Sequence, residues 1–150
     1  MRTVIQRVSK ASVEISTARV GEINQGLLLL IGIEEDDSKQ DIDWLCRKTC
    51  NMRIFSDENG NMNLSVKHVG GDILVVSQFT LHASTKKGNR PSFLKSAKPG
   101  ISKPLYEEFK KQMEYELGKP IYCGKFGADM KITLVNDGPV TIVLDSKNKE

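Results

Sequence analysis

The stretch LLLLIGI, from Leu27 to Ile33, decides the fold class of this sequence. It is the longest apolar run in the chain, and it is too short to cross a bilayer, which needs about 20 apolar residues. A strand with one face in water alternates apolar and polar residues, whereas an uninterrupted apolar run is typical of a strand buried on both faces. The stretch therefore predicts a buried strand in a protein without a membrane role.

Two later segments have the periodicity of amphipathic helices. The first opens on acidic residues and Ser38, which are typical of a helix start. Its inward face repeats at i, i+3, i+4, i+7 and i+8, with Ile42, Leu45, Cys46, Thr49 and Cys50. The second helix can be capped by Ser102 and ends at Gly118 and Pro120. Its apolar stripe repeats every four residues, with Leu105, Phe109, Met113 and Leu117.

The remaining periodic segments predict strands. GDILVVSQFTL, residues 71–81, is rich in β-branched residues and predicts a central strand with alternate side chains on opposite faces. Residues 3–8 and 11–15 predict a hairpin or two successive strands, residues 56–63 a turn, and residues 130–135 and 140–145 two last strands. The order ββ–β–α–β–α–ββ predicts one compact α/β domain over residues 1–150, with a mixed sheet covered by two helices.

Composition narrows the class of protein. The chain has 150 residues, 39% of them hydrophobic and 27% charged, which is typical of a globular protein that folds without disulfides or a metal. Three cysteines are an odd number, and the first residues, MRTVIQRVSK, lack the apolar core of a secretory signal. We therefore expect a cytoplasmic protein.

The usual catalytic signatures are absent. The sequence has no GxSxG, GxxxxGK[ST], GxGxxG or HExxH. Cys46 and Cys50 could share a metal, but no second pair of ligands is suitably spaced, and we interpret them as core residues. His68 lies in a turn-rich stretch and His82 ends the predicted strand, so both are expected to be structural or solvated. We predict no metal and no cofactor.

Hydroxyl and amide groups gather where the predicted central strand ends. SQFTLHAST, residues 77–85, places Ser77, Gln78 and Thr80 there. Such clusters at strand ends often build functional sites, and a strand end capped by its own backbone is the alternative.

A basic segment follows this cluster. Residues 83–106 contain no acidic residue and carry Lys86, Lys87, Arg90, Lys95, Lys98 and Lys103. A charge run is usually a solvated face. The missing acidic residues, together with Phe93 and Tyr106 among the cations, instead favour a surface for a nucleic-acid backbone and a stacked base.

Gly138-Pro139 lies at the start of the last predicted strand, in LVNDGPVTIVLD. Proline at a first strand position loses no ladder hydrogen bond, so a simple strand start explains it. A cis bond would instead point two consecutive carbonyls in nearly the same direction, where they could hold an ammonium group. Both forms are compatible with the sequence.

SQFTL (residues 77–81) and NDGPVT (residues 136–141) together resemble the paired signature of the D-aminoacyl-tRNA deacylases, also called D-tyrosyl-tRNA deacylases. MRTVIQRVSKASV, KGNRPSF and FGADMKITLVNDGPVT resemble the family in order and spacing, so the resemblance spans the chain. It implies a homodimer of α/β subunits with barrel-like strands, which hydrolyses the ester bond of D-aminoacyl-tRNA and of glycyl-tRNA mischarged on non-cognate tRNA.

The resemblance also implies roles for residues. Ser77, Gln78, Phe79 and Thr80 would form the active site, and a cis Gly138-Pro139 pair would enter it from the partner subunit and reject L-aminoacyl groups. Arg7 would tether this pair. Lys86, Lys87, Arg90, Lys95 and Lys98 are expected to bind tRNA. For the chemistry we favour backbone N–H groups near Phe79 and Thr80 as an oxyanion hole, with the ribose 2′-OH helping to activate water.

Two alternatives remain open. In one, the chain is a nucleic-acid-binding module without catalysis, which explains the basic segment but gives Gly138-Pro139 no role. In the other, Thr80 is the nucleophile of a different small hydrolase, although nothing obvious in the sequence would activate its hydroxyl.

Overall fold

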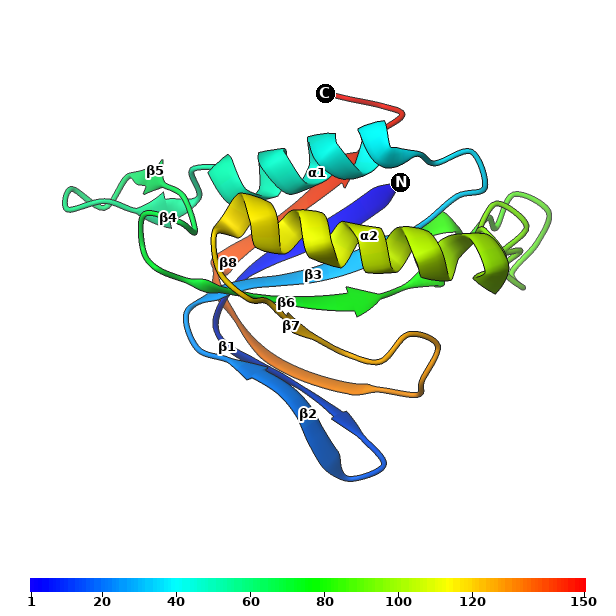
Figure 1. Ribbon diagram of the computed structural model, residues 1–150, viewed down its shortest axis with the longest axis horizontal. Helices are drawn as coiled ribbons and strands as arrows, with labels where there is room; N and C mark the ends of the chain where they lie inside the picture. Colours follow the sequence, from blue (N-terminus) through cyan, green and yellow to red (C-terminus); the bar gives the residue numbers. More distant parts are fainter.

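Two helices lie side by side on one face of a curved six-stranded sheet in the computed structural model, which describes residues 1–150 (Figure 1). The sheet contains β1 (Arg2–Ile15), β2 (Ala18–Ile23), β3 (Gly26–Gly32), β6 (Asp72–Ser77), β7 (Tyr122–Cys123) and β8 (Lys131–Asp145). The helices are α1 (Lys39–Asn51) and α2 (Pro99–Leu117), and η1 (Phe79–His82) is a short 3-10 helix. The predicted turn at residues 56–63 belongs to a small hairpin of β4 (Phe55–Ser56) and β5 (Met62–Leu64).

Strand pairing explains the curvature of the sheet. β3 pairs in parallel with β6, and β6 with β7, so that α1 and α2 serve as the crossovers between them. β1 is antiparallel to three strands: residues 2–8 pair with β3, residues 11–15 pair with β2, and β8 runs along both parts. The sheet is therefore nearly closed, and the predicted class, an α/β domain with mixed, barrel-like strands covered by two helices, is confirmed.

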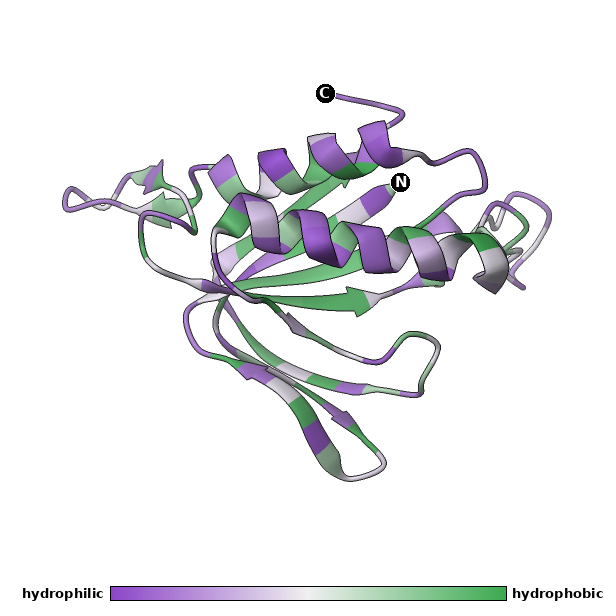
Figure 2. Ribbon diagram, viewed as in Figure 1, coloured by the Kyte–Doolittle hydropathy of each residue, from purple (hydrophilic) through white to green (hydrophobic).

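The apolar run that predicted a doubly buried strand lies in β3 and has a core on each side. Leu27, Leu29 and Ile31 pack against the helices, in a cluster that includes Ile42 and Phe109. Leu28 faces the inside of the curled sheet, in a second cluster with Val8, Val13, Leu74 and Val76. Figure 2 shows the apolar colouring of these central strands. Each fully buried side chain of this kind contributes about 1.5–3 kcal/mol.

The predicted central strand is too long, because β6 ends at Ser77. Its last ladder bond is donated by Gln78 N to Ile31 O (2.7 Å), and the chain then turns into η1 instead of alternating faces. This turn packs directly over Gly32, where an added Cβ would lie 2.9 Å from His82 Cδ2 and 3.1 Å from Gln78 O. Only a residue without a side chain permits that approach, so a glycine on another strand determines where β6 ends.

Three other boundaries differ from the predictions. Residues 3–8 and 11–15 form one continuous strand, β1, and the last two predicted strands form one strand, β8, interrupted by irregular pairing near Gly138. Ser102 is not the cap of α2, which begins at Pro99. Proline suits a first helical position because its missing N–H would have no partner there. Ser102 Oγ donates instead to Lys98 O (3.1 Å). Neither helix is long and apolar enough to span a bilayer.

Candidate active site

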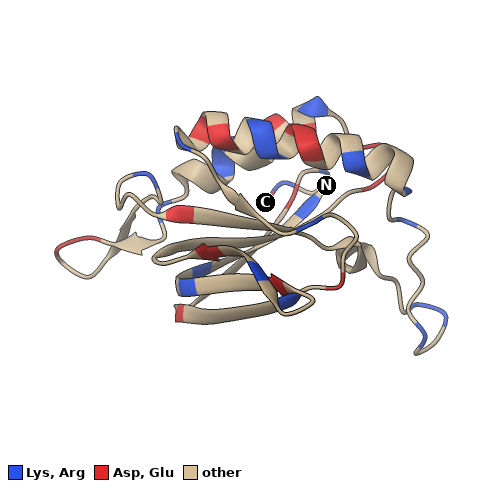
Figure 3. Ribbon diagram, turned by 60° about the horizontal axis from the view of Figure 1, so that its bottom comes forward, with Lys and Arg blue, Asp and Glu red and all other residues tan.

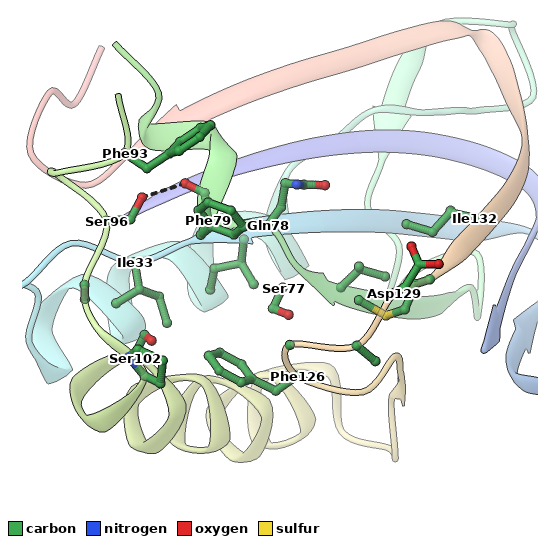
Figure 4. A pocket seen from close by; sticks show the side chains of 17 residues that line it. Ile33, Ser77, Gln78, Phe79, Phe93, Ser96, Ser102, Phe126, Asp129 and Ile132 are labelled. Carbon is green, nitrogen blue, oxygen red and sulfur yellow. Dashed lines mark hydrogen bonds between the residues drawn. The ribbon is translucent and has the colours of Figure 1, made fainter. Parts of the chain in front are cut away.

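A cavity of about 560 Å³ lies where β6 ends, between η1, the start of α2 and the loop before β8 (Figure 4). Ser77, Gln78 and Phe79 form one side of it. The other sides are lined by side chains from the basic segment, from α2 and from residues 126–132, including Phe93, Ser96, Ser102, Phe126 and Asp129. The hydroxyl and amide cluster of the sequence therefore borders a cavity, as expected for a strand end that carries function.

The side chains of the SQFT stretch are held by local contacts. Gln78 Nε2 donates to Thr80 Oγ1 (2.6 Å), and Ser96 Oγ donates to Phe79 O (2.8 Å). The rings of Phe79 and Phe93 meet edge to face with centroids 5.0 Å apart, and both remain partly exposed. Thr80 does not line the cavity, and no histidine or carboxylate hydrogen-bonds its hydroxyl. The arrangement therefore lacks the base that a threonine nucleophile needs.

Backbone donors are available at the start of η1. The first N–H groups of a helix have no partner within it. The N–H groups of Phe79 and Thr80 donate none of the backbone hydrogen bonds formed in turns and loops, whereas the N–H of Gln78 donates to Ile31 O of β3. Two free N–H groups beside a cavity have the chemistry of an oxyanion hole.

Gly138 and Pro139 lie in an exposed bulge of β8, joined by a cis peptide bond. Between the pairs Val8–Asn136 and Gln6–Thr141, four residues of β8 lie opposite one residue of β1, so residues 137–140 protrude. Asn136 Nδ2 donates to Arg7 O and to Val140 O (both 3.0 Å) and closes the base of the bulge.

Arg7 lies directly beside this bulge. Its Nε donates to Asp137 O (3.0 Å) and its Nη1 to Ile54 O (2.6 Å), and the residue is buried. Gly138 has φ +126°, and an added Cβ would meet Arg7 Nη2 at 2.8 Å. The guanidinium therefore holds the backbone at Asp137 and leaves no room for a side chain at Gly138.

The bulge does not border the cavity, since neither Gly138 nor Pro139 is among the residues that line it. Ser77 pairs with Ile31 of β3, and Ile31 pairs with Thr3 of β1, whereas the bulge lies beside Arg7 of β1. Four residues of strand span about 13 Å. One chain therefore does not bring Gly138-Pro139 into its own cavity.

Residues 4–145 match the family described as D-Tyr-tRNA(Tyr) deacylase. The chain belongs to this family. Relatives named D-aminoacyl-tRNA deacylase include those of Bacteroides fragilis, 63% identical, and Flavobacterium johnsoniae, 62% identical, each over 150 residues and 100% of both chains. A solved structure titled c-Myc DNA Unwinding Element Binding Protein is 38% identical, with a TM-score of 0.89 over 97% of this chain and 98% of that chain. The chain is thus a deacylase-family enzyme, a hydrolase.

The cationic side chains of the basic segment of this deacylase are exposed to solvent. Lys86, Lys87, Arg90, Lys95 and Lys98 are exposed, and none takes part in an ion pair. Figure 3 shows much of the segment as a loop that extends from the body of the domain. The expectation that Tyr106 stacks on a base is wrong, because Tyr106 is buried and its hydroxyl donates to Val75 O (3.3 Å). Phe93, 37% exposed, remains accessible.

The other titratable groups are structural. Cys46 and Cys50 lie buried between α1 and α2, and burial raises the pKa of both thiols, to about 12 for Cys50. His68 is exposed, and its Nδ1 accepts a hydrogen bond from Ser65 N (3.0 Å). The carboxylates of Glu34, Asp36 and Asp37 lie close together, but Asp37 pairs with the Met1 ammonium and with Lys147 (3.7 Å), which already supply positive charge.

Several residues of the site were given no functional role from the sequence. Phe126, Ala128 and Met130 line the cavity from FGADM, and Asn136 organises the bulge from NDGPVT. Both stretches carry the family resemblance, and this resemblance could have identified these four residues as part of the site. Ser96 and Ser102 had no comparable signal, because only the path of the chain brings them to the cavity.

Proposed function

We propose that this protein hydrolyses the ester bond of D-aminoacyl-tRNA and releases the free amino acid and the tRNA. The observation that carries the proposal is the cavity at Ser77, Gln78 and Phe79, which opens beside a segment of unpaired cations. A cavity of this size suits a terminal nucleoside with its aminoacyl group, and the cations suit the phosphates behind it. Relatives with this name cover the whole chain, which supports the same assignment.

The active site is completed by a second copy of the chain. Gly138 and Pro139 are exposed and do not line the cavity of their own chain, which supports entry of the pair of one subunit into the cavity of another. In the homodimer, the carbonyls of the partner's Gly138 and Pro139 accept hydrogen bonds from the α-ammonium group of the substrate. Arg7 holds the pair in place through Asp137 O.

Chirality is then selected by rejection. With the ammonium group, the ester carbonyl and the ribose fixed, the side chain of a D-residue points to open space, while that of an L-residue meets the Gly138-Pro139 backbone. Such a filter does not read the identity of the side chain. Many D-aminoacyl groups are therefore substrates, and glycine, which has no side chain to reject, is hydrolysed from non-cognate tRNA.

The chemistry requires little beyond positioning, because an aminoacyl ester is already activated. Ser77 and Gln78 hold the terminal adenosine, and Phe79 shapes the cavity. The N–H groups of Phe79 and Thr80 stabilise the developing oxyanion. The 2′-OH of the terminal ribose helps to activate the attacking water, which explains why no side-chain base lies beside Thr80.

The test compares D-tyrosyl-tRNA with L-tyrosyl-tRNA as substrates of the purified protein, together with a D-tyrosyl-tRNA that ends in 2′-deoxyadenosine. The D-ester should be hydrolysed, the L-ester should persist, and the 2′-deoxy ester should react slowly. Sedimentation should give a dimer. Equal hydrolysis of both esters would refute the filter, and an acyl-enzyme on Thr80 would refute the substrate-assisted chemistry.

A non-catalytic nucleic-acid-binding module is the second candidate. The unpaired cations favour it, and the solved structure of 38% identity is titled as a binding protein for a DNA element. This reading predicts an affinity for RNA or DNA that falls steeply with salt, without turnover of charged tRNA. Turnover of D-tyrosyl-tRNA would reject it.

A further inference from the structure

The 3-10 helix η1 carries the proposed oxyanion donors. Side chains of a single two-residue bridge contact both of its ends. Glu34 and Ser96 form an isolated antiparallel bridge. From this bridge Ser96 Oγ donates to the carbonyl of Phe79, the first residue of η1 (2.8 Å). The carboxylate of Glu34 lies 3.3 Å from Nδ1 of His82, the last residue of η1. One short bridge therefore restrains the whole turn.

His82 is an unusual residue for a packing role. It is only 2% exposed, and neither ring nitrogen makes a hydrogen bond. A buried polar group without a partner costs free energy and calls for an explanation. The ring lies against Gly32 on one side and near Glu34 on another, so it has little room to move. It does not line the cavity and cannot contact a substrate there.

We propose that His82 and Glu34 form a positioning pair for the hydrolysis, which rests on the function proposed above. The carboxylate of Glu34 packs against the imidazole and limits movement of the C-terminal end of η1, while the hydrogen bond from Ser96 holds its N-terminal end. The N–H groups of Phe79 and Thr80 then keep a constant position at the start of η1 while the substrate carbonyl becomes an oxyanion. Preorganised donors of this kind stabilise the transition state more than the bound substrate.

Kinetics of single and double variants test the pair. His82→Ala and Glu34→Ala should each lower kcat for D-tyrosyl-tRNA by about 10- to 100-fold, because misplacing a reacting group by 1 Å costs about 100-fold. KM should not change, since neither residue touches the substrate. The double variant should lose no more than the single ones, because two residues that act as a pair are not additive.

Two further variants separate positioning from folding. His68→Ala removes the other histidine, which is remote from η1, and should leave kcat unchanged. Glu34→Gln keeps the length of the side chain and a polar oxygen beside Nδ1, so it should recover most of the activity lost in Glu34→Ala. Glu34 is 22% exposed and lies near two other carboxylates, so its replacement should leave the fold intact even if His82→Ala does not.

The outcomes distinguish this proposal from the proposed function. Normal kcat in Glu34→Ala, or losses in the two single variants that add in the double variant, would overturn the pair while deacylase activity stands. A change in KM with constant kcat would also overturn it. Absence of D-tyrosyl-tRNA turnover by the unaltered protein would overturn both.

Discussion

Replacing Gly138 by alanine tests how the bulge of β8 is built. Gly138 has φ +126°, a region that residues with a side chain rarely adopt. The new Cβ would lie 2.8 Å from Arg7 Nη2 and 2.9 Å from Val140 Cγ2, both closer than an ordinary contact. Since Arg7 is buried, the strain must be relieved by moving the guanidinium or the bulge.

The size of the effect follows from two contributions. An unfavourable backbone conformation costs about 1–3 kcal/mol. Moving Arg7 also weakens its hydrogen bonds to Ile54 O and Asp137 O, and a hydrogen bond from a charged group is worth about 1.5–3 kcal/mol. Together, Gly138→Ala should lower the free energy of unfolding by about 3–5 kcal/mol. It should also abolish D-tyrosyl-tRNA hydrolysis, because the displaced pair no longer fits the partner's cavity.

Urea unfolding of the protein and of two variants provides the measurement. Gly88→Ala is the matched control for the backbone, because Gly88 has φ +142° and nothing within 4 Å of an added Cβ. It should cost only the backbone contribution, about 1–3 kcal/mol. Equal losses of stability in Gly138→Ala and Gly88→Ala would refute the argument that the Arg7 contact matters. Full activity in Gly138→Ala would refute the role of the bulge in catalysis.

Three other perturbations have defined outcomes. Thr80→Ala should keep deacylase activity within about 10-fold, since its hydroxyl only accepts from Gln78, and complete loss in a folded variant would indicate a nucleophile. Alanine at Lys86 and Lys87 together should weaken tRNA binding and reduce the slope of log affinity against log salt by about 2, one for each phosphate contact, and an unchanged slope would exclude them from the tRNA surface. Burial opposes ionisation of Asp41, but hydrogen bonds from Ser146 and Ser38 outweigh it and lower the pKa of this carboxyl below its usual range. Its contribution to stability is therefore present above about pH 4 and lost as the pH falls below that value. Asp41→Asn should destabilise the protein at neutral pH, and the difference from the unaltered protein in urea unfolding should shrink toward about pH 2; a difference that does not vary with pH would contradict this.

Periodicity predicted the elements well, because the spacing of residues on one face follows from the local geometry of a strand or a helix. LLLLIGI predicted a doubly buried strand, and β3 has a core on both sides. The stripe of α1 was correctly assigned, with Cys46 and Cys50 buried. The stripe of α2 was correct at Phe109, Met113 and Leu117, whereas Leu105 is only half-buried. The resemblance of SQFTL and NDGPVT identified the family, because both stretches are specific and their spacing is preserved.

The tertiary structure decided what depends on a partner distant in sequence. β6 ends at Ser77 because Gly32 of another strand lets η1 pack over it. Tyr106 is buried and Phe93 accessible, although both lie among cations in the sequence, because α2 turns one ring inward. Local periodicity contains no information on the packing of η1 over Gly32, whereas the spacing of Tyr106 to Phe109 and Met113 places Tyr106 on the buried face of the helix. The sequence by itself thus determined the fold class and the family. The folded chain decided where β6 ends and that the Gly138-Pro139 bulge does not border the cavity at Ser77, because both depend on contacts between segments distant in sequence.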